Sequence, residues 1–172
     1  MRTVRTKIYK FNELSNEAKQ KAIEKYRNTD YGDYQIAWDN TKEDAHEIGL
    51  KITELSEYKN NKGEFLFSAA EIAQNIFNNH GKMCETYKTA EKFISEWQPI
   101  FNNYMDEKHE DYESNESENT LQELEDYFLH SLLEDYRSMY FNDIEHQNSD
   151  EYISETIEVN DYEFMADGKM FN

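Results

Sequence analysis

The sequence contains little of the residue types on which most covalent and metal chemistry depends. It has one cysteine, Cys84, one proline, Pro99, and five glycines in 172 residues. One cysteine excludes an internal disulfide, and no glycine-rich phosphate loop or glycine-flanked nucleophile occurs. There is also no long apolar run and no apolar leader segment. We therefore expect neither a disulfide-stabilised protein nor a membrane protein, and we expect it to reside in the cytoplasm.

Candidate metal and catalytic residues are equally scarce. His80 and Cys84, in HGKMC, have a zinc-like spacing, but a zinc site takes three or four ligands and no second cysteine exists. The acidic stretches lack the central glycine or the distal glutamate of an EF-hand calcium loop. Among 37 acidic residues, no pair of carboxylates is marked out as an acid and a base. The sequence therefore predicts no enzyme, no metal site and no cofactor.

Aromatic residues, by contrast, are abundant, with 13 Tyr, 10 Phe and 2 Trp. Such side chains bury a large apolar area, and Tyr and Trp also carry a polar tip. A chain of this length buries roughly 70% of its unfolded surface on folding. We therefore predict one folded domain over residues 1–172 rather than a disordered polyanion.

Charge is distributed very unevenly along the chain, whose formal net charge is −19. Residues 1–105 hold 15 Lys or Arg and 16 Asp or Glu, whereas residues 106–172 hold 3 and 21. The stretch DEKHEDYESNESE, residues 106–118, contains seven acidic residues and no aliphatic one. A field of this sign repels nucleic acid and attracts basic proteins.

Hydrophobic spacing predicts strands and helices in the first part of the chain. The expected elements are a strand, two helices and a β-hairpin, within residues 2–11, 14–27, 34–50 and 51–68. Ser15 is expected to be the N-cap of the first helix. Gly49 is expected to end the second helix, because the residue after a helix often takes a left-handed conformation.

The following part is expected to be mainly helical. Three helices are predicted within residues 68–81, 82–105 and 120–141. Pro99 should kink or split the second of them, because proline removes an amide donor and clashes with the preceding turn. Met83 and Met139 are placed on the buried faces of the second and third helices by their spacing.

The C-terminal part completes the predicted fold. Asn148 and Glu151 would form a capping-box-like start of a last helix. Asp167 and Gly168 would form the type I′ turn of a C-terminal hairpin. The fold class is therefore α+β and predominantly helical, with five to six helices packed on a small antiparallel sheet and a C-terminal hairpin.

Carboxylates of the acidic half, along residues 106–145 and 150–167, are the candidates for partner binding. Spaced along a surface, they would imitate a phosphate backbone, and a basic groove that gains affinity from counter-ion release would accept them. Tyrosines among them, such as Tyr127 and Tyr136, would add rigid contact area. The predicted partner-binding residues are Asp111, Glu113, Glu116, Glu118, Glu123, Asp126, Tyr127, Glu134 and Asp135. The alternative is a solvated acidic face that keeps the protein soluble.

Three segments resemble a known group of proteins. KIYKFNELSNEAKQKAIEKYR, residues 7–27, and ISETIEVNDYEFMADGK, residues 153–169, resemble a widespread group of small proteins encoded by bacteriophages and mobile elements. HGKMCETYKTAEKF, residues 80–93, is similar to the same group. The resemblance implies a phage or prophage origin, and small acidic phage proteins include anti-CRISPR proteins and DNA-mimicking antirestriction proteins. It carries over no functional residues.

Charge and resemblance together lead to one functional hypothesis. We expect an inhibitor of a bacterial defence system, an anti-CRISPR protein that binds an RNA-guided Cas nuclease through its acidic surface and blocks its nucleic-acid function. The partner would be a basic nucleic-acid-binding protein, without direct binding to nucleic acid or membrane. The alternative is a phage accessory protein that engages a host polymerase, or an antitoxin that neutralises a basic toxin.

Overall fold

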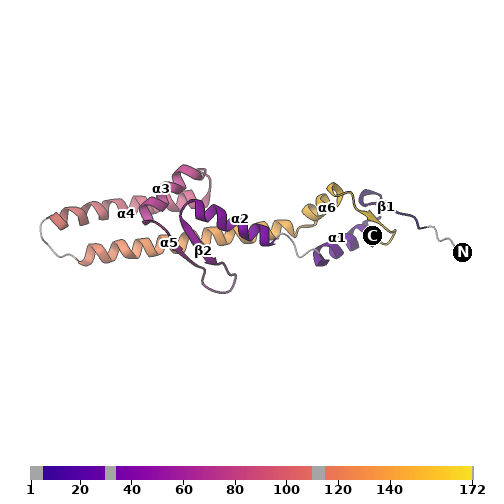
Figure 1. Cartoon of the computed structure of the whole chain (residues 1–172), viewed down its shortest axis with the longest axis horizontal. Helices are drawn as coiled ribbons and strands as arrows, with labels where there is room; N and C mark the ends of the chain where they lie inside the picture. The colour runs from indigo at the N-terminus through magenta and orange to yellow at the C-terminus, as the bar shows by residue number, and fades with distance from the viewer. Residues whose placement is uncertain (1–5, 30–33, 110–114, 172) are drawn as a thin grey trace. The chain divides into compact units, whose positions relative to one another are not determined.

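The computed structural model describes residues 6–29, 34–109 and 115–171. These residues form six α-helices and two antiparallel sheets of two strands each, which confirms a predominantly helical α+β fold (Figure 1). None of the described helices has the length and apolar content that a membrane crossing requires. The chain divides into two compact units, which we call the terminal unit (Met1–Ala37 with Asn142–Asn172) and the central unit (Trp38–Phe141).

The terminal unit joins the two ends of the chain. Its elements are β1 (Tyr9–Lys10), the 3-10 helix η1 (Phe11–Glu13), α1 (Asn16–Thr29), α6 (Asp150–Val159) and β4 (Glu163–Phe164). Strand β1 pairs antiparallel with β4, with Tyr9 opposite Phe164. The predicted N-terminal strand is therefore confirmed only at Tyr9 and Lys10. Residues 6–8 belong to no strand, Phe11 begins η1, and residues 2–5 lie outside the described part. Ile153 and Ile157 of α6 complete a separate core with α1 and β4.

Serine side chains begin both helices of the terminal unit. The Ser15 hydroxyl accepts a hydrogen bond from the Ala18 amide at 3.3 Å, which confirms it as the N-cap of α1. At α6 the N-cap is Ser149, whose hydroxyl accepts from the Tyr152 amide at 3.2 Å. The predicted cap at Asn148 is wrong by one residue, because serine caps as well as asparagine does. The Asn148 amide instead donates to the Tyr34 hydroxyl at 2.7 Å.

The C-terminal hairpin turns at Gly168 with a geometry that differs from the prediction. A type I′ turn needs a positive φ at both central residues. Gly168 has a φ of +84°, but among the described residues other than glycine only Asp161 has a positive φ, so Asp167 does not. A Cβ atom on Gly168 would lie 2.1 Å from the backbone oxygen of Ala18. Glycine is required here because the hairpin backbone contacts α1 directly.

The central unit packs helices around one hairpin. Its elements are α2 (Tyr34–Glu47), β2 (Leu50–Glu54), β3 (Lys62–Phe65), α3 (Ala69–Asn79), α4 (Glu85–His109) and α5 (Asn115–Gln147), with the first turn of α2 and the end of α5 lying in the terminal unit. Gly49 follows α2 with a φ of +91°. Ser68 caps α3 and forms a reciprocal capping box with Glu71. Both helix boundaries agree with the sequence prediction.

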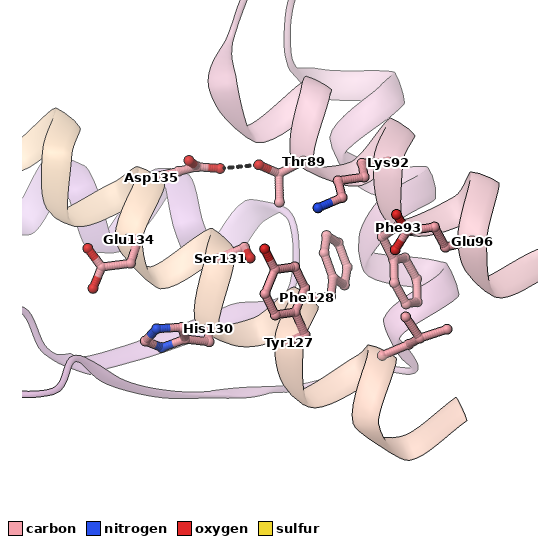
Figure 2. Close-up of a pocket in the computed structure, with 11 residues that line it drawn as sticks. Thr89, Lys92, Phe93, Glu96, Tyr127, Phe128, His130, Ser131, Glu134 and Asp135 are labelled. Atoms are coloured by element: carbon pink, nitrogen blue, oxygen red, sulfur yellow. Dashed lines mark hydrogen bonds between the residues drawn. The ribbon is translucent and has the colours of Figure 1, made fainter. Parts of the chain in front are cut away.

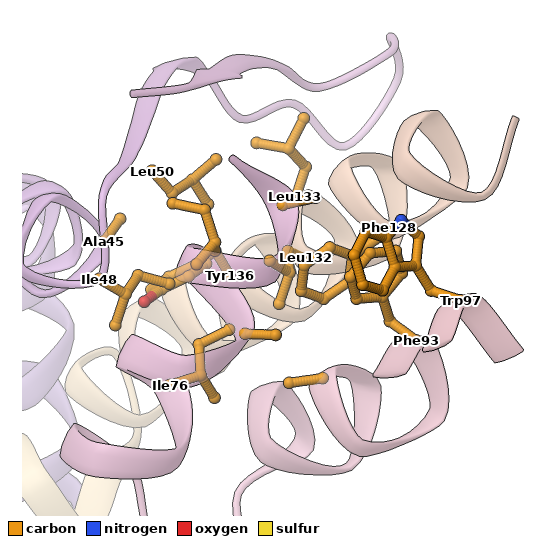
Figure 3. Close-up of a cluster of buried hydrophobic side chains, with 14 of the residues drawn as sticks. Ala45, Ile48, Leu50, Ile76, Phe93, Trp97, Phe128, Leu132, Leu133 and Tyr136 are labelled. Carbon is orange, nitrogen blue, oxygen red and sulfur yellow. The ribbon is translucent and has the colours of Figure 1, made fainter. Parts of the chain in front are cut away.

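One hydrophobic cluster fills the central unit (Figure 3). Leu132 and Tyr136 of α5 are fully buried in it. Phe128 of α5 stacks on Phe93 of α4 with ring centroids 4.2 Å apart. Helix α5 also contacts α2, through the hydrogen bond from Tyr136 to Asp44, and the hairpin, through the rings of Phe128 and Phe65.

Helix α4 differs from the prediction at Pro99. The helix is 25 residues long and continues without interruption through Pro99, so the predicted split is wrong. Proline removes one backbone hydrogen bond, and stacking of Trp97 on Phe101, with centroids 4.3 Å apart, holds the two sides of the helix together. Met83 lies before the helix and is 85% exposed, and Met139 of α5 is 47% exposed, so neither belongs to a buried face.

Candidate partner-binding site on helices α4 and α5

Helix α5 carries every predicted partner-binding residue that the structure places. The six with described side chains are Glu118, Glu123, Asp126, Tyr127, Glu134 and Asp135. Asp111 and Glu113 lie outside the described residues. Glu116 belongs to the first turn of α5, but its side chain is also outside the described part.

Three of these carboxylates form an exposed acidic row on the first half of α5. The row consists of Glu118, Glu123 and Asp126, all of which are exposed. Asp126 accepts a hydrogen bond from the Gln122 amide at 2.9 Å. Glu118 and Glu123 have no hydrogen-bond or ion-pair partner within the residues that the structure describes. The acidic row can therefore meet a partner without breaking an ion pair of its own.

Glu134 and Asp135 have a different role, because their carboxylates hold elements together. Glu134 accepts a hydrogen bond at 2.7 Å from the side-chain amide of Asn61, a buried residue of the hairpin. Asp135 accepts a hydrogen bond at 2.7 Å from the Thr89 hydroxyl of α4 (Figure 2). Each of the two is half-buried and already bonded within the chain. Their part in partner binding stays a prediction.

Burial changes the protonation of Asp135. Desolvation raises the pKa of this carboxyl above its usual value, although the hydrogen bond from Thr89 opposes the shift. The nearby charges of Glu85 and Glu134 raise the pKa further. Asp135 thus binds its proton more tightly than an exposed aspartate does.

Helices α4 and α5 run antiparallel and enclose a groove. Thr89 meets Asp135, and Trp97 further along α4 donates to Glu125 earlier in α5, so the two helices run in opposite directions. The groove has a volume of about 510 Å³. It is lined by Thr89, Lys92, Phe93, Glu96, Leu124, Tyr127, Phe128, His130, Ser131, Glu134 and Asp135 (Figure 2). Three predicted site residues, Tyr127, Glu134 and Asp135, are therefore brought together with side chains of α4.

The contribution of α4 to this groove was missed at the level of sequence. Thr89, Lys92 and Glu96 follow one another at helical spacing beside the buried residue Phe93. This spacing marks the border of a buried face, where a neighbouring helix is expected. The spacing of α4 alone does not say which helix lies opposite, so the pairing with α5 had no signal in the sequence.

Of the other residues considered as sites, His80 and Tyr136 pack in or beside the core, whereas Cys84 does not. The His80 Nδ1 atom lies 2.7 Å from the Thr86 hydroxyl, and its Nε2 atom lies 3.6 Å from Asp44. Asp44 also accepts a hydrogen bond from Tyr136 at 2.8 Å. Tyr136, predicted as a contact tyrosine, is fully buried, and this burial raises the pKa of its hydroxyl. Cys84 is exposed, and no group of three metal-ligating side chains occurs among the described residues.

No protein-family model, curated protein or solved structure matches the chain. The resemblance to phage-encoded proteins therefore stays a prediction. Function has to be inferred from the geometry and charge of the site itself.

Proposed function

We propose that the protein is a stoichiometric inhibitor that binds the basic nucleic-acid groove of another protein through the acidic row of α5. The partner we favour is an RNA-guided Cas nuclease, so the protein would act as a phage-encoded anti-CRISPR protein in the cytoplasm of the host bacterium. The observation that carries the proposal is the acidic row itself, which is exposed on one helix and has no cation paired with it in the described part of the chain.

The spacing of the row suits a surface that normally binds phosphates. An α-helix rises about 1.5 Å and turns about 100° per residue. Glu118 and Asp126 are therefore about 12 Å apart along the axis, and the three carboxylates fall within about 140° around it. This length corresponds to about three to four phosphate steps along one strand of a duplex. A groove that binds phosphates through Lys and Arg would gain the same counter-ion release from such a row.

Charge reversal on α5 tests the proposal, with a matched control on another helix. Glu123→Lys with Asp126→Lys changes two exposed acids three residues apart, and Glu155→Lys with Glu158→Lys makes the same change on α6. Purified variants would be added to guide-loaded Cas nucleases, and cleavage of target DNA would be measured against inhibitor concentration. We expect the α5 variant to lose at least about tenfold in potency, because it meets a basic groove with the wrong sign of charge. The α6 variant should inhibit as the wild type does.

The outcomes separate this proposal from its alternative. Equal inhibition by wild type and the α5 variant would contradict the role of the acidic row. If wild type inhibits none of the nucleases but co-purifies with a host polymerase or a small basic toxin, the protein is an accessory or antitoxin-type binding protein instead. Association with a Cas nuclease should also slow as salt rises, because exposed charges are screened beyond about 10 Å at 0.1 M ionic strength.

A further inference from the structure

The groove between α4 and α5 has a chemistry that the acidic row does not explain. Its volume of about 510 Å³ lies within the roughly 300–1,000 Å³ that pockets for small ligands span. The rings of Phe93 and Phe128 are nearly parallel, at 4° and 4.2 Å, and both are almost completely buried. The faces of these two rings cover each other, so the base of the groove is apolar and closed, and the aromatic surface that a ligand can reach is the ring of Tyr127.

One wall of the groove already binds a cation. Tyr127 is 55% exposed, and the Lys92 ammonium lies 5.0 Å from the centre of its ring. This is the geometry of a cation–π interaction. Figure 2 shows Lys92 reaching from α4 toward Tyr127 and Phe128 of α5. A cation of the chain itself therefore occupies the position that a cation of a partner would take.

Three carboxylates line the same groove. Glu96, Glu134 and Asp135 line the groove, and Lys92 is the one Lys or Arg among the described lining residues. Glu134 and Asp135 each accept a hydrogen bond from within the chain. Glu96 is exposed and has no hydrogen-bond or ion-pair partner among the described residues. Both oxygens of Glu96 are therefore available to a donor that enters the groove.

We infer that this groove receives an arginine side chain of the basic partner, an inference that rests on the proposed function. The guanidinium would stack on the Tyr127 ring and form two parallel hydrogen bonds with the Glu96 carboxylate. Arginine is favoured over lysine because its planar group both stacks on aromatic rings and matches the two oxygens of a carboxylate. Lys92 occupies the ring in the free protein and is displaced when the arginine enters.

Peptide titration of the full chain tests this inference directly. Three 12-residue Gly-Ser peptides would carry three arginines, three lysines or three citrullines, since citrulline has the shape of arginine without its charge. NMR would follow the ring signals of Tyr127. We expect the arginine peptide to shift them, the lysine peptide to bind at least about threefold more weakly, and the citrulline peptide to leave them unchanged. Equal shifts by arginine and lysine, equal shifts by arginine and citrulline, or shifts by inorganic phosphate alone would overturn the inference.

Substitutions of exposed residues sharpen the test without opening the core. Peptide affinity of the variants would be measured by isothermal titration calorimetry, because the Tyr127 variants have no ring signal to follow. Tyr127→Ala and Tyr127→Leu should each weaken binding of the arginine peptide by about three- to tenfold, because the ring face is lost. Lys92→Ala should tighten it by about two- to threefold, since a competing cation is removed. Tyr58→Ala, at a residue 90% exposed on the β2–β3 hairpin, is the control and should change nothing. Weaker binding by Lys92→Ala, or unchanged binding by both Tyr127 variants, would contradict the inference.

Failure of the groove and failure of the proposed function give different results. The arginine peptide could shift the Tyr127 signals as expected while charge reversal at Glu123 and Asp126 leaves nuclease inhibition unchanged. Arginine binding in the groove would then be supported, and the role of the acidic row would be contradicted. Conversely, wild type and Tyr127→Ala could inhibit a Cas nuclease equally well while no peptide shifts the Tyr127 signals. Arginine binding in the groove would then be contradicted, and the proposed function would be supported.

Discussion

The terminal and central units differ in how their charges are paired. In the terminal unit, residues 1–37 hold eight Lys or Arg, and residues 142–172 hold nine Asp or Glu. These charges meet in the fold, where the Lys10 ammonium lies 3.0 Å from Asp161 and 3.4 Å from Glu163. In the central unit, by contrast, the acidic row of α5 has no paired cation among the described residues.

This difference shows that charge separated along the sequence is partly recombined by folding. Cutting the chain at residue 105 assigns nearly the whole negative excess to one side, including the acids of residues 150–167. Several of those acids lie against basic residues of the N-terminal segment instead. The acidic half of the sequence, residues 106–172, is therefore not one uninterrupted docking face. The central unit, with 9 basic and 23 acidic residues, keeps most of the unbalanced charge.

Replacing one equally buried phenylalanine in each hydrophobic core by alanine would show whether the two units unfold separately. Phe128 of the central unit and Phe164 of the terminal unit are each 1% exposed, and truncation of such a ring to alanine costs about 3–5 kcal/mol. Trp38 and Trp97 both belong to the central unit, so tryptophan fluorescence reports on that unit while far-UV circular dichroism reports on both. We expect Phe128→Ala to lower the urea midpoint measured by fluorescence. Phe164→Ala should leave that midpoint unchanged and should move only the part of the circular dichroism transition that comes from the terminal unit to lower urea. Equal fluorescence midpoints for the two variants would mean that the units unfold as one cooperative body.

Gly168→Ala should damage the terminal unit alone. The added Cβ would lie 2.1 Å from the Ala18 oxygen, at a φ of +84° that side chains disfavour. We expect a loss of about 3 kcal/mol, seen in urea unfolding by circular dichroism and absent from tryptophan fluorescence. Gly81→Ala is the control, since the nearest atom to its Cβ is the Cys84 sulfur at 3.9 Å. A loss of similar size at Gly81 would show that the effect is not the contact with α1.

Much of the fold follows from local sequence signals. Ser15, Ser68 and Gly49 begin or end helices where their chemistry predicts, because caps depend on neighbouring residues alone. The type I′ turn at Asp167 was predicted wrongly for the opposite reason. Gly168 is held by its contact with Ala18, which lies 150 residues away in the sequence, and local turn preference does not encode such a contact.

In the candidate site, too, some features follow from the local sequence and others depend on contacts between distant residues. Exposure of Glu123 and Asp126 follows from their places on the helix opposite the buried stripe. Exposure of Glu118 does not, because it lies five full turns before the buried Tyr136, on the same side of the helix. The bonds of Glu134 to Asn61 and of Asp135 to Thr89 were not predictable, because each joins residues from different elements. Charge alone marks a residue as acidic, and only the packing of elements decides whether its carboxylate binds a partner or the chain itself.

Arg27→Met would weaken the charge pairing of the terminal unit by a smaller amount. Arg27 donates to the backbone oxygen of Asn148 at 3.0 Å and forms an ion pair with Asp150. Loss of the hydrogen bond to Asn148 should cost about 1 kcal/mol. The hydrogen bond from Arg27 also lowers the pKa of Asp150, so this contribution is present above the ordinary aspartate pKa and is lost as the pH falls through the lowered value. Urea unfolding should therefore show a smaller difference between variant and wild type at pH 3 than at pH 7, and a constant difference would contradict the role of Asp150.

Asp135→Asn should have the smallest effect, with the opposite dependence on pH. Burial raises the pKa of Asp135 in the folded state, so the folded chain holds this proton more tightly than the unfolded chain does. The stability from that proton is present below the ordinary aspartate pKa and is lost as the pH rises through the raised value. Asparagine keeps an acceptor for Thr89 without the charge, so the variant should be at least as stable as wild type at pH 7, within about 0.5 kcal/mol. Its stability should fall less than that of wild type as the pH rises from the ordinary aspartate pKa toward 7. Thr89→Val removes the hydrogen bond that opposes the shift and should steepen the fall, because the charged carboxylate then loses its donor. A fall in stability that is the same in wild type and both variants would show that the Asp135 carboxyl is not desolvated between α4 and α5.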